Sequence, residues 1–114
     1  MFKEDCIFCK IIQGKIPAQK VYEDEEVLGF KDISPITPIH YLFVPKFHVD
    51  SLAEVTDFTI LSKMHKALVQ VAAQEQLSER GYRVVINTGT EGGQTVFHMH
   101  LHLLGGRQLS ARIN

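Results

Sequence analysis

Apolar residues recur every three to four positions in one long stretch near the middle of the chain. They are Phe58, Leu61, Met64, Leu68, Val71 and Ala72. This spacing places them on one face of a helix and predicts a helix over residues 57–76. Ser51 and Glu54 have the spacing of a capping box, and Thr56 offers a second N-cap. Gly81 follows the predicted end of this helix.

Shorter apolar runs, separated by turn residues, predict strands. They cover residues 21–22, 27–30, 40–44, 82–87 and 96–104. The acidic run 24–26 predicts a hairpin turn, and Pro45 ends the third strand. Residues 6–12 predict a short N-terminal helix. We therefore expect an α+β fold, an antiparallel sheet with one long helix and one short N-terminal helix.

Length and composition exclude several classes of protein. The 114 residues fit a single domain, residues 1–114, and 45% hydrophobic with 22% charged residues is ordinary for a globular chain. A net charge of -1 gives no electrostatic footprint for nucleic acid, although a small phosphate ligand needs only local donors. No apolar run approaches the ~20 residues of a membrane span. Residues 1–6 lack a signal-peptide pattern, so we expect a cytoplasmic protein with no membrane partner.

The last predicted strand carries histidine at every second position. On a strand, His98, His100 and His102 share one face, and the apolar residues between them enter the core. A solvated polar face does not require histidine, and three charged imidazoles in a row would repel one another. Two functional interpretations remain. The imidazoles chelate a metal, or one of them is a nucleophile whose neighbours set its tautomer and supply protons.

The loop before this strand favours the nucleophile. Residues 88–95 include Gly89, Gly92 and Gly93, which would let backbone N–H groups approach a phosphate. Asn87 and Thr95 add neutral donors. A positioned nucleophile with donors for the phosphate oxygens is what phosphoryl transfer requires.

Three separated segments resemble the histidine triad (HIT) proteins, most closely the Hint branch of nucleoside phosphoramidate hydrolases. They are "IFCKIIQGKIPA" (7–18), "DISPITPIHYLFVPKFH" (32–48) and "NTGTEGGQTVFHMHLHLLGGR" (87–107). The resemblance covers nearly the whole chain except its final residues. It implies a single HIT domain that hydrolyses the P–N bond of a purine nucleotide of the AMP or GMP type, through a nucleotidyl-histidine intermediate.

The resemblance also implies roles for individual residues. His100 would attack the α-phosphorus, and His102 would contact the phosphate and the leaving group. His98 would arrange the site, and His40 would lie behind the triad. The remaining implied contacts are Asp32 for the ribose, Asn87, Gly93, Thr95 and Val96 for the phosphate, and Phe8, Ile11, Phe30 and Ile33 for the walls of the base pocket. From the residues alone, core packing is the stronger interpretation of these last four residues.

Cys6 and Cys9 form a C-x-x-C motif, which supplies half of a tetrahedral zinc site. The alternative to a zinc site is that both cysteines are simply buried in the core as free thiols. No βαβ context favours a redox motif. His48 and His98 are candidates for the missing ligands. Resemblance to bacterial triad proteins and to galactose-1-phosphate uridylyltransferases implies all four residues, holding one structural zinc per subunit and no catalytic metal. A competing hypothesis is a zinc hydrolase whose metal lies on all three triad histidines.

The resemblance further implies a homodimer in which the sheet continues from one subunit into the next. The long helix and the strand near residues 82–87 would form the interface. The rival class of function is a nucleotide-binding and zinc-binding interaction module with little catalysis.

Overall fold

The computed structural model describes residues 2–113, and five strands form one antiparallel sheet. The strands are β1 (Lys20–Glu23), β2 (Val27–Lys31), β3 (Ile39–Pro45), β4 (Arg83–Val85) and β5 (Leu101–Gly105). Their order across the sheet is β1-β2-β3-β5-β4, so β5 lies between β3 and the edge strand β4. The helices are α1 (Ile7–Ile12), the 3-10 helix η1 (Leu52–Glu54) and α2 (Thr59–Gln74). The expected α+β fold is confirmed.

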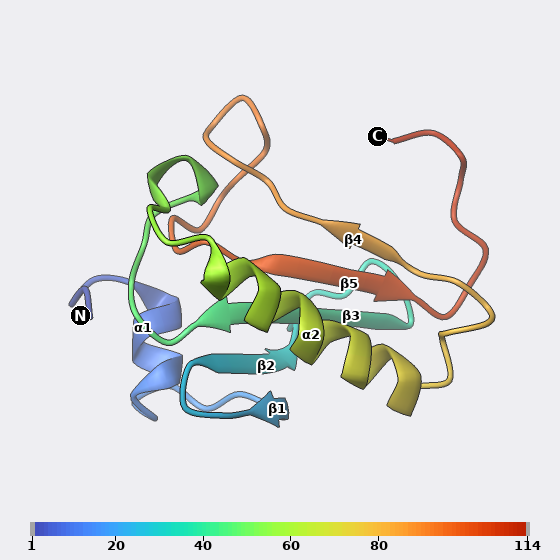
Figure 1. Cartoon of the computed structure of the whole chain (residues 1–114), viewed down its shortest axis with the longest axis horizontal. Coiled ribbons are helices and arrows are strands. Elements are labelled where there is room, and N and C mark those ends of the chain that lie inside the picture. Colours follow the sequence, from blue (N-terminus) through green and yellow to red (C-terminus); the bar gives the residue numbers. More distant parts are fainter. Residues whose placement is uncertain (1, 114) are drawn as a thin grey trace.

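The two α-helices, α1 and α2, pack on separate hydrophobic cores. In Figure 1, α2 crosses one face of the sheet, where Met64 and Leu68 join Phe43, Leu101 and Leu103 in the larger core. The smaller core holds the α1 residues Phe8, Cys9 and Ile11, together with Leu28, Phe30, Leu42 and Val44 from β2 and β3. Because adjacent residues of a strand point to opposite faces, the sheet buries side chains on both sides.

The predicted long helix is present but begins and ends two residues inside the predicted bounds. The capping-box serine belongs to another element, because the Ser51 hydroxyl accepts the Ala53 N–H at the start of η1. Asp57 instead accepts the Thr59 N–H at the first residue of α2. Ser51 therefore caps η1 and Asp57 binds the first N–H of α2, whereas the sequence pattern assigned the Ser51 cap to the long helix.

The predicted strand over residues 96–104 is wrong in its first half. Only Leu101–Gly105 form β5, and its last pair with β3 is Phe43 with Leu101. Beyond that pair β3 reaches Pro45, which has no N–H for the ladder. Met99 N–H donates instead to the Val49 carbonyl at 2.8 Å. His98 and His100 therefore lie in an extended approach to the strand.

The strand predicted over residues 82–87 is also shorter, since β4 pairs with β5 only from Arg83 to Val85. Within residues 2–113, no helix has the length and apolar character needed to cross a membrane.

Candidate active site and metal centre

The three histidines of the triad lie on the α1 side of the sheet, although only His102 belongs to β5. His102 pairs with Leu42, a residue of the smaller core, whereas Leu101 and Leu103 enter the larger one. His98 and His100 are buried, and the Phe8 ring meets the His100 ring edge-on at 5.1 Å between centroids. The alternation in the sequence therefore gave the correct faces, even where no ladder forms.

Hydrogen bonds to carbonyl oxygens set the tautomers of His98 and His100. A carbonyl only accepts, so the ring nitrogen that faces one carries the proton. His100 Nδ1 donates to the His98 carbonyl at 2.7 Å, which leaves the Nε2 lone pair of His100 free. His98 Nε2 donates to the Pro45 carbonyl at 2.9 Å, which leaves the Nδ1 lone pair of His98 free. The lone pair is therefore on Nε2 in His100 and on Nδ1 in His98.

A hydrogen-bond relay sets the tautomer of His102. The Ile36 N–H donates to His40 Nδ1 at 3.2 Å, so His40 carries its proton on Nε2. That Nε2–H donates a hydrogen bond to His102 Nδ1, and the two nitrogens lie 3.0 Å apart. The proton of His102 is therefore on its Nε2, a buried atom with no hydrogen-bond partner among residues 2–113. An unpaired buried N–H is costly, so this donor is available for a ligand oxygen or nitrogen.

Burial keeps these imidazoles neutral. Desolvation, and then the neighbouring His100 and His40, lower the pKa of His102 to about 4. Desolvation also lowers the pKa of His100 and that of His40, against the opposing effect of the Asp32 carboxylate. At neutral pH the row of histidines therefore carries no mutual charge repulsion.

Four residues gather into a second arrangement beside the triad. The ligand atoms of Cys6, Cys9, His48 and His98 all lie within 4.8 Å of one another. Cys9 Sγ is 3.3 Å from His48 Nδ1, and His98 Nδ1 is 3.4 Å from Cys6 Sγ and 3.6 Å from Cys9 Sγ. Tetrahedral zinc with ordinary bond lengths separates sulfur and nitrogen ligands by about 3.6 Å. The donor set and its spacing fit zinc.

The surroundings orient both imidazoles of this cluster. His48 Nε2 donates to Asp50 Oδ1 at 2.6 Å, so its Nδ1 lone pair points to the thiols, as does that of His98. Such carboxylate and carbonyl partners are the usual second layer of a metal site. Burial raises the pKa of the Cys6 thiol, so metal binding would release its proton. Asp50 was not predicted as a site residue, although its position two residues after His48 could have indicated it. The Pro45 carbonyl is a backbone group and has no signal in the sequence.

Asp32, His40 and His102 form another compact group, and their ligand atoms also lie within 4.8 Å of one another. The relay argues against a cation there. His40 Nδ1 accepts the Ile36 N–H, so neutral His40 must carry its proton on the nitrogen that faces the group. Among residues 2–113, the two clusters of possible ligand atoms contain His98 and His102 separately, and neither contains His100.

The expected base-pocket residues are only partly brought together. Phe8 and Phe30 meet edge-on at 5.4 Å, and Ile11 packs in the same core. Ile33 does not join them, because it is 94% exposed. Asp32 is half-buried, with Oδ2 3.4 Å from His40 Nε2 and Oδ1 accepting the Ser34 N–H at 2.8 Å. The carboxylate thus lies beside the histidine relay.

The expected phosphate-binding residues frame the loop that precedes the triad. Gly93 has φ of 86°, and a Cβ there would lie 4.0 Å from the side-chain amide of Asn87. That backbone conformation favours glycine. Thr95 is exposed and Val96 half-buried. Both residues also line a hollow of about 360 Å³ that extends to Lys3, Cys6, His48 and Phe97.

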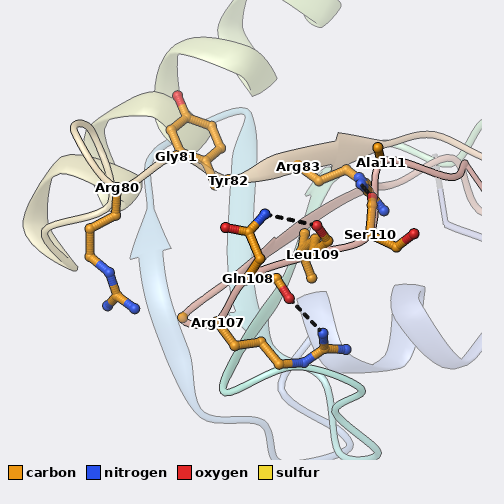
Figure 2. A pocket seen from close by; sticks show the side chains of 10 residues that line it. Arg80, Gly81, Tyr82, Arg83, Arg107, Gln108, Leu109, Ser110 and Ala111 are labelled. Atoms are coloured by element: carbon orange, nitrogen blue, oxygen red, sulfur yellow. Dashed lines mark hydrogen bonds between the residues drawn. The ribbon is translucent and has the colours of Figure 1, made fainter.

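Another hollow, of about 370 Å³, lies away from the triad (Figure 2). It is lined by residues 80–83 and 106–111, between the end of the α2–β4 connection and the C-terminal tail. Arg83 donates to the Ser110 carbonyl, and Arg107 donates to the Gln108 carbonyl at 3.1 Å. Its lining includes none of the histidines, so the candidate chemistry lies elsewhere.

Comparison with known proteins agrees with this geometry. The HIT domain family model matches residues 13–109, and the chain belongs to that family. The chain is similar to a histidine triad protein from Clostridium difficile, with TM-score 0.96 and 45% identity over 98% of this chain and 99% of the other. It is also similar to a HIT family hydrolase from Legionella pneumophila, with TM-score 0.91 and 47% identity over 94% and 97%. A histidine triad nucleotide-binding protein from Candida albicans gives TM-score 0.82 and 33% identity over 96% and 87%.

Proposed function

We propose that this protein is a hydrolase that cleaves the P–N bond of purine nucleoside 5′-phosphoramidates, or a related bond of AMP adducts, with His100 as nucleophile. The observation that carries the proposal is the tautomer of His100. Its Nδ1–H donates a hydrogen bond to the His98 carbonyl, so its Nε2 carries a lone pair. Burial lowers the pKa of His100, which keeps the ring neutral. The similar Legionella and Candida proteins, described as a hydrolase and as nucleotide-binding, support the same reaction class.

The first step forms a bond between His100 Nε2 and the α-phosphorus and breaks the bond from phosphorus to the leaving nitrogen. The His102 Nε2–H would donate a hydrogen bond to that nitrogen, which takes its proton from solvent as it leaves, and the His102 ring lies 4.9 Å from His100 between centroids. The positive charge on the phosphoryl-histidine would be stabilised through its Nδ1–H bond to the His98 carbonyl.

In the second step, water attacks the phosphorus and the His100–phosphorus bond breaks. The proton of the water passes to solvent, His100 regains its Nε2 lone pair, and the nucleoside monophosphate is released. The backbone of Gly93 and Val96, with Asn87 and Thr95, would hold the phosphate oxygens through both steps. Asp32 would bind the ribose. Phe8, Ile11 and Phe30 would contact the base from the core, and the exposed Ile33 would cover its open side.

Cys6, Cys9, His48 and His98 would hold one zinc in this proposal. A closed Cys₂His₂ shell leaves no open position for water, so the zinc would supply stability and not chemistry. It would tie α1 to the segment that leads into β5. His98 would then contribute to catalysis through position, because its backbone carbonyl orients His100.

The proposed function is tested by incubating the purified protein with adenosine 5′-phosphoramidate in a strong chelator. We expect AMP release with multiple turnovers. Nucleotide binding without turnover would favour the alternative, a nucleotide- and zinc-binding interaction module. Turnover lost in chelator while circular dichroism stays unchanged would favour a catalytic zinc on the triad.

The acid limb of the pH–rate profile should lie well below pH 6.5. An unperturbed histidine has a pKa of 6.5, whereas burial lowers the pKa of His100 and brings that of His102 to about 4. The reactive neutral forms therefore persist as the pH falls through 6.5 and are lost only as it approaches the lowered values. Measuring kcat/KM between about pH 4 and about pH 8 tests this. A half-loss of kcat/KM at pH 6.5 or above would contradict it.

A homodimer is part of the proposal, with the sheet continued through β4. This strand is an edge of the sheet, and edges with unpaired backbone groups favour pairing with another strand. Val84 on β4 and Val69 on α2 are exposed apolar residues that such an interface would cover. We expect sedimentation equilibrium to give twice the 12.9 kDa chain mass. A particle of the single-chain mass at micromolar concentration would contradict the dimer.

A further inference from the structure

Gln94 is a buried amide in the loop that precedes the triad, and it has no role in the proposed reaction steps. Its side chain is 4% exposed and lies between the glycine loop and the triad. Its Oε1 accepts the Gly89 N–H at 2.8 Å, and its Nε2 donates to the Asp50 carbonyl at 2.7 Å and the Val96 carbonyl at 3.1 Å. The amide oxygen and both N–H groups of the amide therefore have hydrogen-bond partners.

These three bonds join three separate parts of the site. Gly89 begins the glycine loop, and its carbonyl also accepts the Gln94 backbone N–H at 3.0 Å. Val96 contributes its backbone to the proposed phosphate contacts. Asp50 is the residue whose carboxylate orients His48 in the metal cluster. Gln94 therefore connects the loop to both the phosphate-binding backbone and the segment that follows β3.

The orientation of the amide is fixed by its partners. A flipped amide would place NH₂ against the Gly89 N–H and oxygen against two carbonyls. An amide satisfied in only one orientation, in a buried position, holds its neighbours in one arrangement. Donors held in place before the substrate arrives are the most effective stabilisers of a phosphoryl group.

We propose that Gln94 is a positioning residue for the phosphate-binding loop, holding the backbone of Gly89 and Val96 in place for the phosphate. The inference rests on the proposed function, because it takes the loop at residues 88–96 as the phosphate site. It predicts that Gln94 affects binding of the phosphate of a nucleotide. Binding of the nucleoside part, for which Asp32 and Phe8 are proposed contacts, should not depend on Gln94.

The test compares AMP with adenosine, using calorimetric affinities for the wild type, Gln94→Glu and Gln94→Met. Glutamate keeps the acceptor for the Gly89 N–H but places an oxygen against two carbonyls. Methionine removes all three bonds without adding charge. We expect the AMP dissociation constant to rise about tenfold to a hundredfold in both variants, as for a buried hydrogen-bond network that is broken. Adenosine affinity should change by less than about threefold.

Gln19→Glu is the matched control, because it makes the same substitution at an exposed position before β1. It should bind both ligands as the wild type does. Equal weakening of AMP and adenosine in the Gln94 variants, or no change in AMP affinity, would overturn the inference. A wild type that binds no AMP would overturn the proposed function with it, whereas normal AMP binding without hydrolysis would overturn only the reaction.

A measurement on the wild type alone keeps the inference testable if the variants do not fold. The Gly89 amide hydrogen should exchange slowly with solvent in the free protein, because Gln94 holds it. The amide of the exposed neighbour Thr90 is the internal comparison. Exchange at Gly89 as fast as in an unstructured peptide would show that the hydrogen bond from Gly89 N–H to Gln94 is not formed in solution. That result would overturn the inference.

Discussion

Replacing His100 by alanine should reduce AMP release from adenosine 5′-phosphoramidate by about 10⁴-fold or more, because the covalent route depends on one nitrogen. His100 Nε2 is the ring nitrogen of the triad left with a free lone pair beside the proposed phosphate site, since His102 has a proton there and His98 turns its lone pair to the thiols. A neighbouring imidazole cannot take over without breaking its own hydrogen bonds. The measurement is single-turnover kinetics with saturating substrate.

AMP affinity separates loss of the nucleophile from loss of the site. His100→Ala removes a ring that packs against Phe8 but leaves the phosphate loop and Asp32 in place, so AMP should still bind. His65→Ala is the matched control, because His65 lies exposed on α2 and its Nδ1 faces the Leu61 carbonyl of its own helix. Turnover within tenfold of the wild type in His100→Ala would rule out a covalent histidine intermediate.

Local patterns predicted the faces of the fold better than the lengths of its elements. The alternation from His98 to Leu103 assigned each side chain to the correct side of the sheet, because an extended chain alternates whether or not it is paired. The end of β5 was not predictable from that segment. It depends on Pro45, which lies in the neighbouring strand β3, 56 positions before Leu101, and has no N–H to continue the ladder.

The candidate site divides in the same way. Cys6 and Cys9 carry a local signal, since their spacing alone indicates half of a metal site. Their partners His48 and His98 come from distant segments, and only the fold brings them within hydrogen-bond distance. Gln94 gave no signal at all. A glutamine in a glycine-rich loop is ordinarily solvent-exposed, and its burial follows from where the Asp50 carbonyl lies.

The metal cluster makes the second large prediction. Cys9→Ala should abolish stoichiometric zinc binding and lower the melting temperature by about 10 °C or more, because a structural zinc contributes directly to folding free energy. Cys9 is fully buried, and its Sγ lies close to both histidine ligands. Zinc content is measured by elemental analysis, and cobalt substitution should give the absorption bands of a tetrahedral sulfur-containing site in the wild type only.

A chelator separates loss of the metal from loss of packing. If zinc stabilises the fold, the chelator should lower the melting temperature of the wild type but leave that of Cys9→Ala unchanged, since the variant has no metal to lose. Equal chelator effects on both proteins, or a wild type without zinc, would contradict the metal site and leave two buried thiols. Below its melting temperature, chelated wild type should still release AMP, because the proposed nucleophile, His100, is held by the His98 carbonyl and not by the metal. Stability would then depend on the cysteine cluster and turnover on the triad, with His98 belonging to both.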